Sequence, residues 1–376
     1  MSSVRPTPGS NAANTTPNRS KPGQMRNNSF DLLRLIGAMC VLIGHSFPLL
    51  ALGTPAIAGF SIHSLGVHMF FAISGYLIAQ SAMRDSNVWR FASKRALRIL
   101  PALWCLVAVT VFAGMLLTNL SPAEYWRHPQ TTAYLSNAYL MINFVLPGVF
   151  PANPIPHIVN GSLWSLPAEV AMYIFAIVSL RFGWRGLAAS TAIFAVFAFL
   201  PGDYRRFAVG PIYLDHMPSV GLFFIFSMWF AVLQKYIPLN WFQAILSFVL
   251  AVLSHQLLGQ PVLTYFLLAY AVIGAGVSPS PIGRHLPDLS YGIFLYSYPI
   301  QQVLIQSGIK DPYTLMVCAT PIVAIFAALS WYLIENPILK IKSYITAAAN
   351  RGDEQPSEIN SPHNLKGWPP SRASAR

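Results

Sequence analysis

Long apolar stretches recur along the chain between about residue 30 and residue 340, and short polar segments separate them. Most of these stretches approach the roughly 20 residues that an α-helix needs to cross the hydrocarbon core of a bilayer. The pattern therefore predicts an all-α fold, a polytopic membrane helix bundle with about ten transmembrane helices. We place these helices near residues 31–51, 65–83, 99–118, 164–181, 186–200, 217–234, 240–257, 261–278, 289–307 and 313–334.

Three parts of the chain fall outside this scheme. Residues 134–150 are apolar but are interrupted by Asn137, Asn143 and Pro147, which favours a re-entrant or interfacial segment over a further crossing. Residues 1–29 and 343–376 contain no long apolar run and are rich in polar and basic residues. Their composition predicts disordered tails on either side of a transmembrane domain at residues 30–342.

Composition and charge agree with a membrane protein. Hydrophobic residues make up 54% of the chain and charged residues only 10%, against about 25% charged in a typical soluble domain. The net charge of +12 is compatible with nucleic-acid binding, but its distribution favours membrane orientation. With the amino terminus inside, the inside loops contain Arg84, Arg90, Lys94, Arg95, Arg98, Arg181, Arg185, Lys235, Arg284, Lys340 and Lys342, and the outside segments only Arg127, Arg205, Arg206 and Lys310. This bias predicts that both termini are cytoplasmic and that nucleic acid is not a partner.

Two polar side chains interrupt the first predicted helix. Arg34 and His45 are eleven residues apart, or about three helical turns, so they share one face at an axial separation of about 16 Å. A charge or an imidazole inside a bilayer is unfavourable unless it is paired or lines a wet cavity. The pair is therefore a candidate functional site within the membrane.

The second predicted helix leads into the most basic segment of the chain, which runs from Arg84 to Arg98. In this segment Arg95 and Arg98 are three residues apart and share one face if the segment is helical. Two guanidinium groups at this spacing suit an anion, because each offers a planar fork to phosphate oxygens. Anchoring of a helix end at lipid headgroups explains the same two residues equally well.

Six short motifs follow one another along the chain. They are FDLLR at residues 30–34 leading to His45, GVHMFFAISGY at 66–76, KRALRILP at 94–101, NGSLWSLPAE at 160–169, SYGIFLY at 290–296 and ENP at 335–337. In this order and at this spacing they resemble the membrane-bound acyltransferase 3 family, over roughly residues 30–340. The resemblance implies a membrane helix bundle that transfers an acyl group, often acetyl, from coenzyme A to a hydroxyl, usually of a carbohydrate.

The resemblance also implies roles for individual residues. His45 would be the general base that activates the acceptor hydroxyl, a role that suits a buried neutral imidazole. Arg34 shares the catalytic assignment and, with Arg95 and Arg98, would hold the donor phosphates at the cytoplasmic mouth. Acyl-CoA, in the simplest case acetyl-CoA, is expected as co-substrate, and no tightly bound cofactor is expected. The acceptor is expected to be a carbohydrate or a lipid-linked glycan, and the location a bacterial inner membrane crossed several times.

Trp164, Glu169 and Glu335 belong to the same motifs. By the resemblance, Trp164 and Glu169 would contact the acceptor at the outer mouth, although an acid in a first helical turn is also favoured by the helix dipole. Glu335 ends the last predicted helix just before Asn336 and Pro337. We expect it to pair with a basic residue near the coenzyme A entrance, and catalytic and structural roles for it are both open.

The chain departs from the family pattern at three positions. Phe294 stands where the family has a second tyrosine, and Ser297 where it has a histidine, so any contribution of that histidine is absent or moved. His68 stands where the family often has an acid, and we interpret it as an interfacial residue at a helix start. Because no His or Cys spacing is typical of a metal site, no metal is expected.

A transporter or flippase for a lipid-linked sugar is the alternative function. Pro101, Pro299 and Pro321 lie in or beside predicted helices and could break them, as transporters often require. Against this alternative, the two halves of the chain show no internal repeat. A noncatalytic scaffold, the third possibility, leaves Arg34 and His45 unexplained. The sequence therefore favours an acyltransferase.

Overall fold

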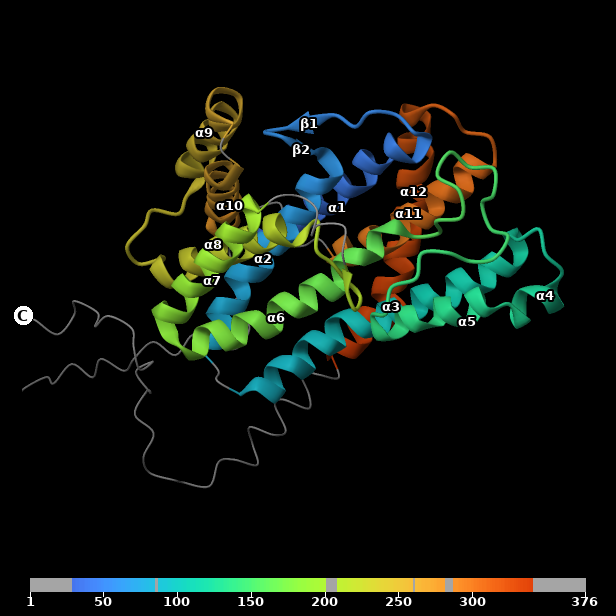
Figure 1. Ribbon diagram of the computed structural model, residues 1–376, viewed down its shortest axis with the longest axis horizontal. Helices are drawn as coiled ribbons and strands as arrows, with labels where there is room; N and C mark the ends of the chain where they lie inside the picture. Colours follow the sequence, from blue (N-terminus) through green and yellow to red (C-terminus); the bar gives the residue numbers. More distant parts are fainter. Residues whose placement is uncertain (1–28, 85–86, 201–207, 260, 281–286, 341–376) are drawn as a thin grey trace, which may run out of the picture.

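The computed structural model describes residues 29–84, 87–200, 208–259, 261–280 and 287–340. Within these ranges the chain is a helix bundle with two short hairpins, which confirms the all-α prediction (Figure 1). The α-helices are α1 (Phe30–His45), α2 (Ile62–Arg84), α3 (Val88–Leu117), α4 (Pro122–Arg127), α5 (Pro129–Leu135), α6 (Ser165–Arg181), α7 (Gly183–Phe199), α8 (Met217–Leu233), α9 (Trp241–Leu258), α10 (Pro261–Val277), α11 (Ser290–Gln306) and α12 (Pro312–Ser330). The hairpins pair β1 (Ala56–Ile57) with β2 (Phe60–Ser61) and β3 (Ala208–Val209) with β4 (Ile212–Tyr213). Short turns are η1 (Pro48–Leu50), η2 (Ser136–Tyr139), η3 (Gly161–Trp164) and the π-helical η6 (Trp331–Glu335).

Each of the ten apolar stretches predicted from the sequence coincides with one of these helices. Six helical segments are long and apolar enough to cross a membrane, namely Phe30–Leu50, Ile62–Arg84, Val88–Leu117, Gly161–Arg181, Trp241–Leu258 and Pro312–Lys340. Three shorter helices are also apolar, namely Gly183–Phe199, Met217–Leu233 and Pro261–Val277. Residues 134–150 are not a helix of their own, because the chain is irregular after η2.

The two predicted tails lie outside the described residues, apart from Ser29. This residue is buried, and its hydroxyl donates a hydrogen bond to the carbonyl of Ser278 at 2.7 Å. Its backbone N–H also donates to the carbonyl of Gly276 at 2.9 Å. Ser29, the first residue that the structure describes, is therefore packed against the end of α10.

Helix α1 lies at the centre of the bundle between α2 and α11 (Figure 1). Helix α2 also packs on α8, which α7 and α10 flank. Glycines permit these close approaches. A Cβ added at Gly66 would lie 2.4 Å from the carbonyl oxygen of Gly37, and one at Gly75 would lie 2.2 Å from that of Phe224. Small residues at such contacts are typical of packed membrane helices.

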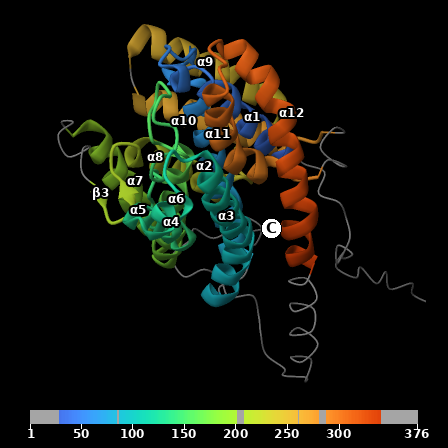
Figure 2. The same cartoon turned by 90° about the vertical axis from the view of Figure 1, so that its right-hand side faces the viewer.

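The prolines considered as possible helix breaks lie inside continuous helices. Pro101 is within α3, Pro299 within α11 and Pro321 within α12. Helix α3 begins at Val88, well before the expected start near residue 99. The basic segment is therefore part of the same helix, and α3 contacts the π-helical turn η6 that follows α12 (Figure 2).

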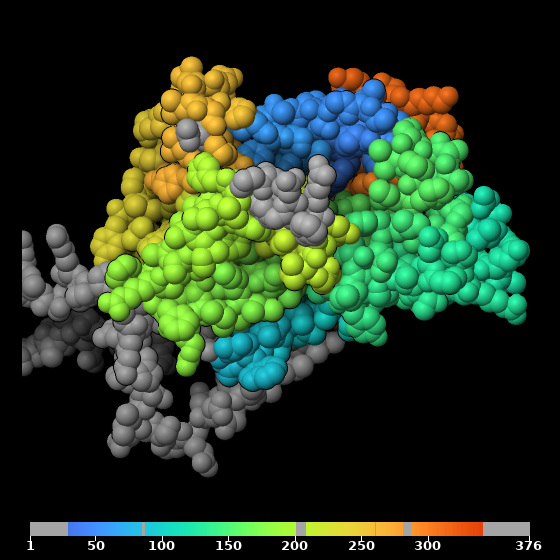
Figure 3. Space-filling view, viewed as in Figure 1, coloured from blue at the N-terminus to red at the C-terminus, as the bar shows by residue number. Residues whose placement is uncertain are grey.

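The segment between α5 and α6 packs against the end of α1 and the start of α12. Ile155 and Ile158 contact a small apolar cluster that includes Leu49, Tyr298 and Leu315. In Figure 3 the green surface of this segment accordingly lies beside the blue chain after α1 and the red start of α12. The cluster fixes the approach of the chain to α6.

Candidate active site

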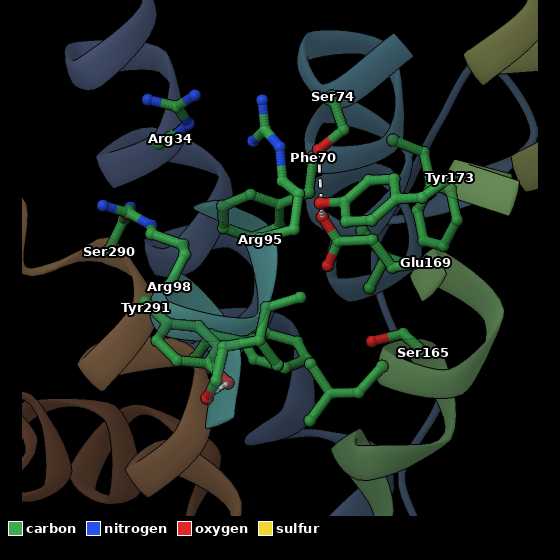
Figure 4. Close-up of a pocket in the computed structure, with 15 residues that line it drawn as sticks. Arg34, Phe70, Ser74, Arg95, Arg98, Ser165, Glu169, Tyr173, Ser290 and Tyr291 are labelled. Atoms are coloured by element: carbon green, nitrogen blue, oxygen red, sulfur yellow. Dashed lines mark hydrogen bonds between the residues drawn. The ribbon is translucent and has the colours of Figure 1, made fainter. Parts of the chain in front are cut away.

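A pocket lies where α1, α2, α3, α6 and α11 meet. Figure 4 shows Arg34, Arg95 and Arg98 on one side of it, and Glu169 with Tyr173 on the other. The remaining lining residues are Val67, Phe70, Phe71, Ser74, Ile99, Ser165, Leu166, Ser290, Tyr291 and Phe294. Three positive charges and one negative charge give the lining a net positive charge, which suits an anion. The structure thus brings together the three arginines that the sequence selected.

Arg34 and Arg98 are each held by a carboxylate. Arg34 donates to Asp31, one turn earlier on α1, at 2.7 Å. Arg98 forms an ion pair with Asp288, which also accepts a hydrogen bond from Ser290 at 2.6 Å. Burial alone would raise the pKa of Asp288, but the guanidinium groups of Arg98 and Arg34 and the bond from Ser290 outweigh burial and hold that pKa below its ordinary value. Asp288 therefore remains a carboxylate that fixes Arg98 at the pocket.

Arg95 is held by aromatic rings instead. Its guanidinium carbon lies 5.6 Å from the ring centroids of both Phe91 and Tyr173, a cation–π arrangement. It forms no ion pair with any residue that the structure describes, and its buried Nε has no hydrogen-bond partner among them. Of the three arginines, Arg95 is therefore the one whose charge is least compensated.

Glu169, expected at the outer mouth, lines the same pocket as the arginines and so lies beside the predicted donor residues. It accepts hydrogen bonds from Ser74 at 3.0 Å and from Tyr173. The physical reason is that α6 begins inside the bundle. Buried Asn160 donates to the carbonyl of Leu295, about a third of the way along α11, at 3.0 Å, and so holds the chain inside the bundle before α6 starts.

His45 is the last residue of α1 and does not line this pocket. Its ring stacks on that of His63, in the first turn of α2, with centroids 4.8 Å apart and ring planes inclined by 23°. Tyr298 of α11 meets the same ring edge-on at 5.4 Å. Because α1 is continuous, His45 lies about three turns, or about 16 Å, along the helix from Arg34. The predicted axial separation of Arg34 and His45 is therefore present, but the two side chains lie in different surroundings.

The segment 160–169 runs from His45 to the arginine pocket. At its start Gly161 lies against Tyr298, where an added Cβ would approach a ring carbon to 2.8 Å. In its middle Trp164 packs on the ring of His216, with centroids 4.4 Å apart. At its end Glu169 lines the pocket. The segment thus connects the predicted acceptor residue Trp164 to both parts of the site.

Glu335 is buried at the end of the π-helical turn η6. Its Oε1 accepts a hydrogen bond from Ser330 at 3.0 Å, while its buried Oε2 has no partner among the described residues. The expected ion pair with a basic residue is absent from the described part of the chain, because Asp288 pairs with Arg98. Arg98 is nevertheless near enough to interact electrostatically with Glu335. Single π-turns of this kind are frequent at functional sites.

Two of the departures from the family pattern are explained by packing. Ser297 is fully buried and donates to the carbonyl of Phe294 at 3.3 Å, while the next residue, Tyr298, contacts His45. His68 is buried in the second turn of α2, with Nδ1 2.7 Å from the carbonyl oxygen of Ser64. The interpretation of His68 as an interfacial helix-start residue is therefore wrong, because α2 begins earlier than expected.

Two residues of the site were not expected from the sequence, Asp288 and His63. Asp288 could have been found from the small number of acidic residues, which is only 12 in the whole chain. An acid beside the motif at 290–296 is a natural partner for a basic cluster. His63 gave no signal, because it precedes the predicted start of the second helix. Its role depends on how two helix ends meet.

Comparison with known proteins identifies the family to which the chain belongs. A family model described as an acyltransferase domain matches residues 27–335. The chain belongs to the acyltransferase 3 family. An O-acetyl transferase of Shigella phage Sf6 is 31% identical over 326 residues, covering 84% of this chain and 96% of that protein. Nodulation protein 10 of Rhizobium leguminosarum bv. viciae is 28% identical over 358 residues, covering 85% of this chain and 95% of that protein. No solved structure matches the chain.

Family membership confirms the resemblance seen in the motifs. The candidate residues from Arg34 to Glu335 all fall within the matched range. The protein is therefore an enzyme, an acyltransferase, and the transporter and scaffold alternatives are set aside. Its apolar helices agree with a membrane protein.

Proposed function

We propose that this acyltransferase is a multi-pass protein of a bacterial inner membrane that transfers an acyl group from acyl-CoA to a hydroxyl of a carbohydrate. The acyl group is acetyl in the simplest case, and the acceptor is a glycan such as a surface polysaccharide or an exopolysaccharide. The net positive pocket of Arg34, Arg95 and Arg98 is the observation that supports the donor assignment most directly. Similarity to a protein named O-acetyl transferase supports transfer to oxygen.

In this proposal the arginine pocket binds phosphate groups of the donor. Guanidinium groups bind phosphate oxygens through paired N–H···O bonds. The pocket has a cavity volume of about 80 Å³, well above the roughly 10–15 Å³ that holds a single water, so a phosphate group can enter it. The rest of coenzyme A extends beyond the pocket. Arg95 contributes most to this binding because none of the carboxylates that the structure describes pairs with it.

The thioester reaches His45 along α1. The axial distance from Arg34 to His45 is about 16 Å, and the long flexible pantetheine arm of coenzyme A separates its thioester from its phosphates. Helix α11 follows the same direction, with Tyr291 at the pocket and Tyr298 beside His45. Donor phosphates and reacting carbonyl are thus accommodated at the two ends of one site.

The reaction itself is a direct transfer. His45 accepts the proton of the acceptor hydroxyl, the hydroxyl oxygen attacks the thioester carbonyl, a C–O bond forms and the C–S bond breaks. The coenzyme A thiolate leaves and takes the proton back from the imidazolium, so no enzyme-bound acyl group is required. Trp164, whose aromatic face suits a sugar ring, is the acceptor residue that this arrangement favours. Glu169 lies with the donor arginines and contributes to that end of the site.

The test is acceptor-dependent release of coenzyme A by the purified protein in lipid nanodiscs. Acetyl-CoA and polysaccharide from the source cells are supplied, the released thiol is measured, and mass spectrometry detects the new ester. His45→Ala should lower turnover by ~10²–10⁴ in protein that still folds, with only a modest fall in melting temperature from the lost ring contacts. His255→Ala, an exposed histidine on α9, is the matched control and should be fully active. Near-normal turnover of folded His45→Ala would show that the base is wrong, and absence of an ester with the unaltered protein would overturn the proposed function.

A further inference from the structure

A catalytic imidazole is usually oriented by a hydrogen bond to its second nitrogen. His68 illustrates this arrangement, because its Nδ1 lies 2.7 Å from the carbonyl oxygen of Ser64. The buried Nδ1 of His45 has no hydrogen-bond partner among the described residues. The carbonyl of Val41, one turn earlier, lies near the ring without giving Nδ1 a bond of normal geometry. The backbone therefore holds the His45 ring less firmly than it holds the His68 ring.

Two aromatic side chains from different helices fix this ring. His63 stacks on one face with centroids 4.8 Å apart, and Tyr298 approaches edge-on at 5.4 Å. Both distances lie in the range of favourable offset-stacked and edge-to-face ring pairs. A ring held between a stacked and an edge-on neighbour cannot turn without losing both contacts. Packing thus adds to the weak backbone contact in orienting the ring.

His63 is itself held in place. Its Nε2 lies 3.2 Å from the hydroxyl of Ser61, the last residue of β2. The end of α1 also approaches the backbone of His63 very closely, because a Cβ added at Gly44 would lie 2.3 Å from the His63 nitrogen. Only glycine allows this approach without a shift of one helix end. The stack therefore depends on Gly44, Ser61 and the first turn of α2 together.

We propose that His63 is a positioning residue of the acyl transfer, whose stacked ring holds His45 in the orientation needed to accept the acceptor proton. This inference rests on the proposed function, since it requires His45 to be the base. The ring face, not the proton of His63, carries the effect.

The experiment compares two replacements of similar size. His63→Phe retains a flat ring and should keep turnover within a few-fold of the unaltered enzyme. His63→Leu fills the space without a flat face and should lower kcat by ~10-fold to ~100-fold, since a small misplacement of a catalytic group can cost ~10². KM for acetyl-CoA should stay unchanged in both, because the arginine pocket is distant from His63. His68→Phe, a buried histidine of the same helix that does not touch His45, is the control and should keep its kcat.

Gly44→Ala tests the same stack with His63 intact. It should separate the two helix ends and lower kcat as His63→Leu does, whereas Gly53→Ala, with no atom within 4 Å of the added Cβ, should not. Equal activity of the Leu and Phe variants, or loss of activity in the Phe variant below a tenth of the original, would overturn the stacking role. If His63→Leu does not fold, the Phe and Gly44 variants decide the matter. A failed inference is distinguishable from a failed function, because the unaltered enzyme and His45→Ala would still differ in acceptor-dependent thiol release.

Discussion

Arg95 and Arg98 differ in what surrounds them, although both face the same pocket. Arg98 is paired with Asp288, and Arg34 with Asp31. Arg95 lies between the rings of Phe91 and Tyr173 without a carboxylate partner in the described structure. An added anion therefore competes with an internal carboxylate at Arg98 but not at Arg95.

Arg95→Ala should weaken coenzyme A binding about ten- to a hundredfold, since a hydrogen bond to a charged group is worth roughly 1.5–3 kcal/mol. The melting temperature should fall only slightly. Arg98→Ala should weaken binding too and should also lower the melting temperature, because it leaves the carboxylate of Asp288 buried without its partner. Arg95→Lys should restore part of the affinity, since an ammonium lacks the planar fork. Titration calorimetry with coenzyme A provides the measurement, and unchanged affinity in both alanine variants would return these residues to headgroup anchoring.

Asp288 gives the domain a contribution to stability that depends on pH. Its pKa is lowered in the folded protein, so its stabilising effect is present above the ordinary carboxyl pKa of about 3.9 and is lost as pH falls through the folded value. Asp288→Asn should lower the melting temperature at pH 7 and flatten its decline between pH 4 and more acidic conditions. Asp31→Asn is the control, because its carboxylate is 54% exposed and such pairs contribute little. Parallel pH profiles of Asp288→Asn and the unaltered enzyme would contradict the argument.

At the scale of helices, apolar periodicity and length were sufficient to predict where the elements are. Every predicted stretch is a helix, because a run of apolar residues in lipid must satisfy its backbone internally. The boundaries were harder to predict where polar residues extend a helix. Helix α3 begins at Val88, and its basic first turns continue through Pro101 without a break. Helix α2 begins at Ile62, which is why His68 proved to be buried.

Close helix contacts in this bundle depend on glycines, which have no side chain, and Gly75 provides a test. A Cβ at this position of α2 would lie 2.2 Å from the backbone oxygen of Phe224 on α8. Moving a helix backbone away from such a contact costs free energy, because its neighbours must move as well. Gly75→Ala should therefore destabilise the protein by about 1–3 kcal/mol, the usual cost of overpacking. The loss should appear as a lower melting temperature in detergent, with Gly53→Ala as a control that changes nothing. A melting temperature equal to that of the control would show that α2 and α8 can separate without cost.

At the scale of the whole molecule, the site depends on contacts that local patterns cannot reveal. Arg98 and Asp288 are 190 positions apart in sequence, and Ser74 and Glu169 are 95 apart. The motifs selected Arg34, Arg95, Arg98 and Glu169 but could not tell that all four line one pocket. That grouping follows from the buried entry of the chain into α6, which is a property of the assembled bundle.

The assembled site has two distinct ends, and the last prediction concerns their sides of the membrane. The arginine pocket is one end, and His45 with His63 and Tyr298 marks the other. In the orientation that the excess of basic residues in the predicted inside loops favours, the pocket end faces the cytoplasm. Donor and acceptor should therefore reach His45 from opposite sides.

Sealed vesicles of known orientation test this arrangement, with labelled acetyl-CoA supplied on one side only. Label should reach an acceptor glycan on the outer side only when the donor is on the cytoplasmic side. Arg95→Ala should reduce this transfer at low donor concentration and recover at high concentration, because it weakens donor binding without altering the acceptor end. Permeabilised vesicles control for total activity. Equal transfer with the donor outside would reject the two-sided arrangement and would still leave His45 as the base, because the proton transfer does not depend on which side the donor enters.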